Sequence, residues 1–199
     1  MKKLTLCLVF LAHLFLVSAC GETPTAKSAL ADVAIALEQN NASLFLSRFD
    51  LKSCAAGQIR NMTDANDALY TLDKLGKSLG IGGMEDLLGN LYDVEHSLKQ
   101  NFVKKVSTGA LVQECSRSDA SGCPWVPDSL RRADVRKVDD SCAIARIVSP
   151  AKMTTWLALA KRGERWMIVG WADLEETAKR YALGRDEILK APAKNGTTI

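Results

Sequence analysis

The sequence predicts an α+β protein in which N-terminal helices pack on a C-terminal antiparallel sheet. Two observations lead to this prediction. Up to residue 106, apolar residues recur at the three- and four-residue intervals of amphipathic helices. After Cys123 the interval shortens to two residues, as in strands whose successive side chains face opposite sides of a sheet. Helices followed by a run of strands are typical of the α+β class.

The helical part begins with residues 27–41, for which Ser28 is a candidate N-cap. Residues 42–54 are compatible with either a short helix or an extended piece. Two further apolar stripes predict helices over residues 63–80 and 84–106. The stripe of the first helix consists of Leu30, Val33, Ala34 and Leu37. We expect these stripes to form the surface of the core.

The second half of the chain predicts two β-hairpins. Residues 133–148 form two strands around Asp139-Asp140-Ser141, and residues 153–171 form a hairpin with Gly163 at positive φ in a charged turn. On the first strand of the second hairpin, one face carries Trp156, Ala158 and Ala160, and the other carries Leu157 and Leu159. On its second strand, strict alternation places Gly170 on one face with Trp166 and Ile168.

The second hairpin, TTWLALAKRGERWMIVGW, resembles the closing hairpin of nuclear-transport-factor-2-like (cystatin-like) domains. Those domains end in a strand, a charged turn with glycine, and a Trp-apolar-Val-apolar strand. The helix over residues 27–41 is similar to their first helix, so the resemblance covers that helix and residues 133–171. It implies a curved sheet wrapped against helices around a cone-shaped cavity. The family includes enzymes and many non-catalytic binding modules, and it supplies no catalytic residue for this chain.

The N-terminus resembles the signal peptide and lipobox of bacterial lipoproteins. Two lysines precede an apolar run that falls short of the roughly 18 residues of a spanning helix. Val17-Ser18-Ala19-Cys20 then matches the lipobox, although leucine is commoner than Val17 at the first position. The resemblance implies removal of residues 1–19 and attachment of lipid to the sulfur and the new amino group of Cys20. The acyl chains would anchor the protein to a membrane.

The mature chain is predicted to consist of a short linker over residues 20–27, a single domain over residues 28–184 and a loose tail over residues 185–199. Of 26 basic residues, Lys2 and Lys3 leave with the signal, so 24 basic residues balance 23 acidic ones. A nucleic-acid-binding domain needs a basic field that this composition does not provide. The composition therefore excludes nucleic acid as a partner.

Four cysteines remain besides the lipid-bearing one: Cys54, Cys115, Cys123 and Cys142. In an oxidising envelope this even number predicts two disulfides, with three possible pairings. The short polar loop CSRSDASGC favours a Cys115–Cys123 bond, which would leave Cys54 to pair with Cys142. The C-x-x-C spacing of zinc sites is missing, and the mature chain keeps one histidine, so we predict no metal site.

Few other residues are candidates for a site. Asp93 and His96 have the spacing of two ligands on one helix face, although a solvated polar face is the preferred interpretation. Arg131-Arg132 and Arg136-Lys137 form a basic run that fits an acidic partner, lipid phosphates or a charged sheet edge. Trp125, in CPWVP beside the predicted disulfide, is expected near the surface as a contact residue.

These patterns predict a lipid-anchored, non-catalytic protein of the bacterial cell envelope that uses no cofactor. Its partner would be an envelope protein or a small apolar ligand. The alternatives are an enzyme using a cavity of the fold and a structural subunit of a membrane-associated assembly. Gly21 stands where some lipoproteins carry the aspartate that retains them at the inner membrane, so we expect the protein in the outer membrane, facing the periplasm.

Overall fold

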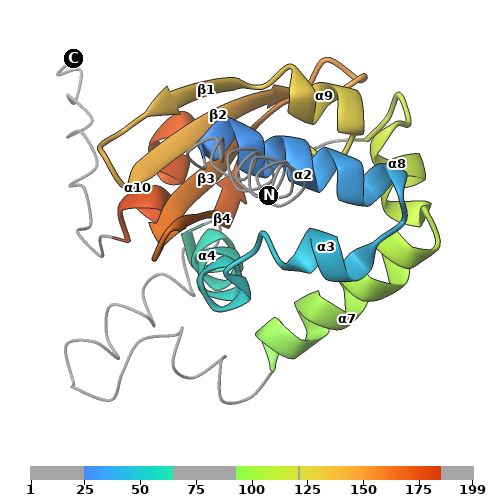
Figure 1. Cartoon of the computed structure of the whole chain (residues 1–199), viewed down its shortest axis with the longest axis horizontal. Helices are drawn as coiled ribbons and strands as arrows, with labels where there is room; N and C mark the ends of the chain where they lie inside the picture. The colour runs from blue at the N-terminus through green and yellow to red at the C-terminus, as the bar shows by residue number, and fades with distance from the viewer. Residues whose placement is uncertain (1–24, 65–92, 121, 185–199) are drawn as a thin grey trace, which may run out of the picture.

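The computed structural model describes residues 25–64, 93–120 and 122–184, which form a four-stranded antiparallel sheet with helices on both faces (Figure 1). In the described ranges, six helices come before the sheet: α2 (Ala26–Glu38), α3 (Ala42–Leu46), α4 (Leu51–Asp64), α7 (Val94–Ser107), α8 (Ala110–Cys115) and α9 (Pro127–Arg131). The strands β1 (Asp134–Lys137), β2 (Cys142–Val148), β3 (Thr154–Arg162) and β4 (Arg165–Ala172) follow, and then α10 (Glu175–Leu183). This order confirms the α+β class. No helix among the described residues has the length and apolarity needed to cross a bilayer.

The first helix begins with a reciprocal cap. The Thr25 hydroxyl accepts a hydrogen bond from the backbone N–H of Ser28 (3.0 Å), and the Ser28 hydroxyl accepts one from the N–H of Thr25 (2.9 Å). Ser28 is thus part of the cap, but the N-cap itself is Thr25. The four residues of the predicted stripe are all buried, namely Leu30, Val33, Ala34 and Leu37.

The undecided segment after α2 forms two helices with a break between them. Asp50 ends the break, because its carboxylate accepts hydrogen bonds from the N–H of Ser53 (3.1 Å) and from Nε of Arg162 (2.8 Å). Burial alone would raise the pKa of Asp50, but these hydrogen bonds outweigh it and lower the pKa. The first turn of α4 is therefore tied to the end of β3. Most of the predicted helix over residues 63–80, and residues 84–92 of the next one, lie outside the described residues.

Both predicted hairpins are confirmed. The strand order is β1-β2-β3-β4, with Val148 opposite Thr154 and Arg162 opposite Arg165. Gly163 has φ 62°, as its turn requires. In the first hairpin, Asp139 accepts a hydrogen bond from the N–H of Ser141 (2.7 Å), which closes the turn. The segment before α4 pairs with the outer edge of β4 through Phe49 and Ile168.

The sheet separates two apolar clusters. The inner face, which packs on the N-terminal helices, carries Ala143, Ala145, Ile147, Leu157 and Leu159. The opposite face, here called the α10 face, carries Cys142, Ile144, Trp156, Ala158 and Ala160 and packs on α10. The predicted alternation along β3 is confirmed. Figure 1 shows α10 on one side of the molecule and α3, α7 and α8 on the other.

Strict alternation along β4 is wrong beyond Ile168. The register passes from Ala158 opposite Gly170 to Leu159 opposite Ile168, so Val169 is an extra residue in a β-bulge. Val169 belongs to the cluster of the α10 face, and a Cβ on Gly170 would also meet α10. Gly170 therefore lies on the face opposite to Ile168, and Trp171 returns to the inner face.

Candidate functional site

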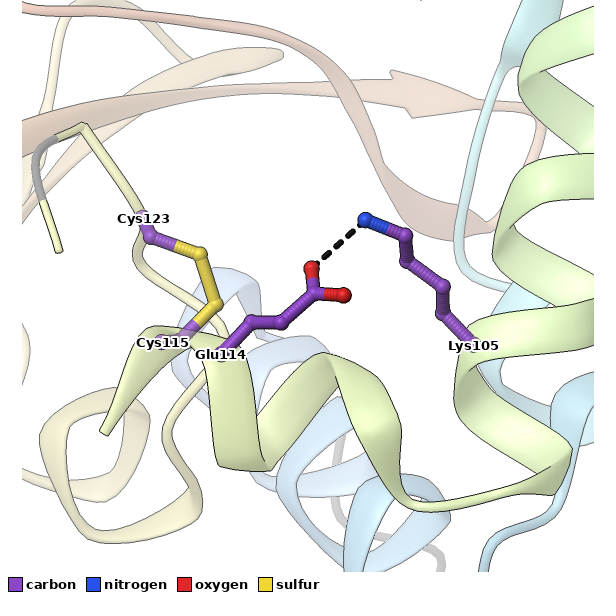
Figure 2. Close-up of a disulfide and its surroundings, with 4 residues drawn as sticks. All are labelled: Lys105, Glu114, Cys115 and Cys123. Atoms are coloured by element: carbon purple, nitrogen blue, oxygen red, sulfur yellow. Dashed lines mark hydrogen bonds and ion pairs between the residues drawn. A yellow bond between two sulfur atoms is a disulfide. The ribbon is translucent and has the colours of Figure 1, made fainter. Parts of the chain in front are cut away.

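The predicted bond between Cys115 and Cys123 is present (Figure 2). It links the last residue of α8 to the segment that leads into α9. Lys105 of α7 forms an ion pair with Glu114 of α8, as Figure 2 also shows. The disulfide and the ion pair together hold α7, α8 and the following loop to one another.

The second predicted disulfide, Cys54–Cys142, is wrong in this structure, since both residues are buried free thiols. Cys54 belongs to the inner-face cluster and its Sγ lies 3.5 Å from the carbonyl oxygen of Ile168. Cys142 belongs to the cluster of the α10 face and its Sγ lies 2.9 Å from the carbonyl oxygen of Ala182. The sheet lies between the two sulfurs. An even number of cysteines does not reveal on which face of a sheet each one lies.

Burial raises the pKa of both thiols, and the Asp50 carboxylate raises that of Cys54 further. Because the thiolate is the reactive form, we expect neither residue to react with a maleimide in the folded protein at neutral pH. After unfolding without reductant, peptide mass spectrometry should find the label on both Cys54 and Cys142. Unlabelled peptides for both after unfolding would show instead that the two are bonded to each other.

Trp125 is a core residue, so its predicted role as a surface contact is wrong. Its side chain is only 4% exposed. The ring centroids of Phe49 and Trp171 lie 5.4 and 5.5 Å from its own, and those of Phe45 and Phe102 lie 5.7 and 5.9 Å away. We call these five residues the aromatic cluster. Rings from four distant segments, rather than solvent, therefore surround the indole.

The helix pair Asp93 and His96 has a capping role. Asp93 is the N-cap of α7, and its Oδ1 accepts a hydrogen bond from the backbone N–H of His96 (2.8 Å). The His96 ring lies beside the side-chain amide of Gln100 (2.6 Å). Across the described ranges, no three His, Cys, Asp or Glu side chains are grouped so that they could hold a metal ion.

One end of the α10 face is left uncovered by α10. Val148, at the end of β2, is 43% exposed, and Leu174, just before α10, is 68% exposed. Val148 lies opposite Thr154, and Trp156 lies opposite Ala172, the last residue of β4, so Leu174 follows the sheet at this same end. Arg146 stands on the same face, two residues before Val148. We call Arg146, Val148, Thr154 and Leu174 the sheet-end surface.

Arg136 borders the sheet-end surface, and its guanidinium contacts one indole ring and two carboxylates. Its guanidinium lies 4.8 Å from the ring centroid of Trp156, and it forms ion pairs with Glu175 (3.2 Å) and Asp134 (3.6 Å). Hydrogen bonding from Lys179 is the main cause that lowers the pKa of Glu175, and Arg136 adds to it. Arg136 therefore fastens β1 to the start of α10 and covers the indole.

A hollow of about 370 Å³ adjoins the sheet-end surface, between α9 and the strands β1 and β2. We call it the α9 hollow, and its lining includes Ser129, Arg132, Asp134, Arg146, Val148 and Ser149. A second hollow of about 510 Å³ lies at the same end of the sheet and includes Met153, Thr154, Trp171 and Asp173. Both are open to solvent. This end of the sheet thus combines exposed apolar side chains, arginines and two depressions, a combination suited to binding.

Sequence reasoning did not single out the sheet-end surface. In the sequence, Leu174, Ala178 and Tyr181 have helical spacing, which would place Leu174 in a helix, whereas it is the extended residue that precedes α10. One signal was available. Arg146 shares a face of β2 with Cys142 and Ile144, and an exposed arginine after two buried residues marks the point where cover of that face ends.

The functional interpretation of this chain depends on the geometry described above. Comparison of the chain with protein-family models, with curated proteins and with solved structures finds no match to any of them.

Proposed function

We propose that this chain is a lipid-anchored, non-catalytic lipoprotein of the bacterial cell envelope that binds another envelope protein through the sheet-end surface. The signal-like N-terminus and the lipobox pattern ending at Cys20 support the anchor. The cap of α2, Thr25, comes five residues after Cys20. At about 3.5 Å per residue, the folded domain would begin within about 18 Å of the lipid. The absence of an inner-membrane aspartate after Cys20 supports the outer membrane.

The observation that carries the binding role is the contrast between the two ends of the α10 face. Where α10 covers it, Ile144 and Ala158 are buried. Beyond α10, Val148 and Leu174 present apolar surface next to Arg146. Exposed apolar side chains at one end of a sheet, beside charged ones, are typical of protein contact sites.

We also propose that the domain is a variant of the nuclear-transport-factor-2-like fold. The helices before an antiparallel meander, and the closing hairpin with Gly163 at its turn, support this relationship. In that fold the inner face of the sheet borders a cavity. Here Phe45, Phe49 and Trp125 pack together on the inner-face side, which is why we favour binding over catalysis in a cavity.

The anchor is tested by expressing the full chain with its own N-terminus in a bacterial host. Mass spectrometry of the N-terminal peptide should show cleavage before Cys20 and lipid on its sulfur and amino group. The Cys20→Ser variant should lose the lipid and leave the membrane fraction. An unmodified Cys20 thiol in the membrane-extracted wild-type protein would contradict the lipoprotein assignment.

The binding surface is tested by placing a photo-crosslinking amino acid at Leu174 in the membrane-anchored protein. Ser43, which is exposed on α3, provides the matched control position. We expect a discrete crosslinked protein adduct from position 174 and none from position 43. Adducts from position 43 alone would show that the partner contacts another surface. No adduct from either position would contradict binding through the sheet-end surface.

A further inference from the structure

We propose that the α9 hollow binds a carboxylate that has an apolar neighbour, as presented by an acidic or C-terminal segment of the partner protein. This inference deepens the proposed function, because it names the chemistry that the sheet-end surface recognises, and it rests on that function for the identity of the partner as a protein.

The first observation is a pair of arginines without an anion. Arg132 and Arg146 are both exposed and line the hollow. Arg146 lies directly opposite Asp134 in the sheet, yet the Asp134 carboxylate is engaged by Arg136 (3.6 Å). Within the described ranges neither Arg132 nor Arg146 forms an ion pair. Two guanidinium groups beside one hollow are suited to a carboxylate, which they can bind through paired N–H groups.

The second observation is a serine hydroxyl that makes no hydrogen bond within the described part of the protein. Ser129 is only 4% exposed and lines the hollow. Among the described contacts its hydroxyl has no hydrogen bond, and it is not closed off from the hollow. The hydroxyl is reached from the open hollow, so its hydrogen can be donated to an oxyanion bound there. Ser149, also buried there, already accepts a hydrogen bond from the N–H of Met153 (3.2 Å) and keeps its own hydrogen to donate.

The third observation is the apolar wall. Val148 and Pro150 line the same hollow as the arginines and the two serines, and Val148 is the half-exposed residue that leads to Leu174. A free inorganic anion would leave this wall in water. A carboxylate carried by an aliphatic group would cover this wall and gain affinity from each methylene that it buries there.

The probes are hexanoate, its neutral analogue hexanamide, and inorganic phosphate, each titrated into the full chain in detergent and followed by NMR shifts. We expect saturable hexanoate binding, at least about tenfold weaker binding of hexanamide, and weaker binding of phosphate than of hexanoate. If hexanamide binds as tightly as hexanoate, the hollow does not recognise the carboxylate group, and the proposal is wrong. If phosphate binds as tightly as hexanoate, the apolar wall does not contribute to binding, and the preference for a carboxylate with an apolar neighbour is wrong.

The variants separate binding from folding. Arg132→Met and Arg146→Met keep the apolar stem and should each weaken hexanoate binding about tenfold, whereas Arg165→Met, an exposed arginine at the start of β4, should leave it unchanged. Ser129→Ala should weaken binding about threefold without lowering the melting temperature, because it removes an unpaired hydroxyl. Equal binding by all four variants would overturn the proposal. Failure of hexanoate to bind, with crosslinking at Leu174 intact, would overturn this inference and leave the proposed function standing.

Discussion

Replacing Trp125 with alanine is expected to lower the free energy of unfolding by about 3 to 5 kcal/mol, the range for truncating a buried tryptophan. The indole is surrounded by four other rings of the aromatic cluster, which come from α3, the segment before α4, α7 and β4. Removing it leaves a cavity that those rings cannot close, because each is packed on a different element. Urea unfolding followed by circular dichroism, without reductant, measures the loss.

Two companion variants make this prediction specific. Trp125→Phe keeps one ring in the cluster and should cost clearly less than the alanine variant. Leu174→Ala removes a side chain that is mostly in water and should change the free energy of unfolding by less than about 0.5 kcal/mol. If Trp125→Ala behaves like Leu174→Ala, the indole does not belong to the core.

Replacing Gly170 with alanine is expected to cost about 1 to 3 kcal/mol, as overpacking of a filled core does. A Cβ at this position would lie 2.8 Å from Cδ2 of Tyr181, closer than carbon atoms approach one another. The ring cannot swing away freely, because the Tyr181 hydroxyl donates a hydrogen bond to the carbonyl oxygen of Gly57 (2.9 Å). The substitution should therefore push α10 off the bulge, and thermal unfolding measures the effect.

Gly57→Ala is the matched control, because its Cβ would meet the same ring. There the nearest atom, Cε2 of Tyr181, lies 3.4 Å away, which is ordinary contact. Alanine is also favoured over glycine in a helix by up to about 1 kcal/mol. We expect Gly57→Ala to be neutral or stabilising. Equal losses in both variants would show that the Tyr181 ring is not held where the structure places it.

The elements that were predicted correctly depend on local patterns. The stripe of α2 repeats every three to four residues, and the hairpin strands β3 and β4 flank a turn in which Gly163 supplies the positive φ. These features are set by residues within one or two turns of each other, so periodicity and turn chemistry are sufficient to predict them.

What was missed depends on contacts between distant segments. Trp125 looked like a surface residue because its prolines and its cysteine neighbour are visible in the sequence, whereas its ring partners are scattered from Phe45 to Trp171. The bulge at Val169 leaves no mark in an alternating apolar strand, since Val169 and Gly170 both fit the pattern. Pairing of the cysteines required knowledge of the faces on which they lie.

The two thiols sealed on opposite sides of the sheet would affect maturation of the chain under the proposed export to the envelope. Before the domain folds, the sulfurs of Cys54, Cys115, Cys123 and Cys142 would all be open to oxidation, and a wrong bond to Cys54 or Cys142 would block closure of the sheet. Cys115 and Cys123 are only eight residues apart in the sequence, so in the unfolded chain they meet more often than the other cysteine pairs do. Once the sheet is complete, Cys54 and Cys142 are buried as protonated thiols, so they supply no thiolate to start thiol–disulfide exchange. Under that proposal, the need for a disulfide isomerase depends on whether the four thiols are oxidised before Cys54 and Cys142 become buried.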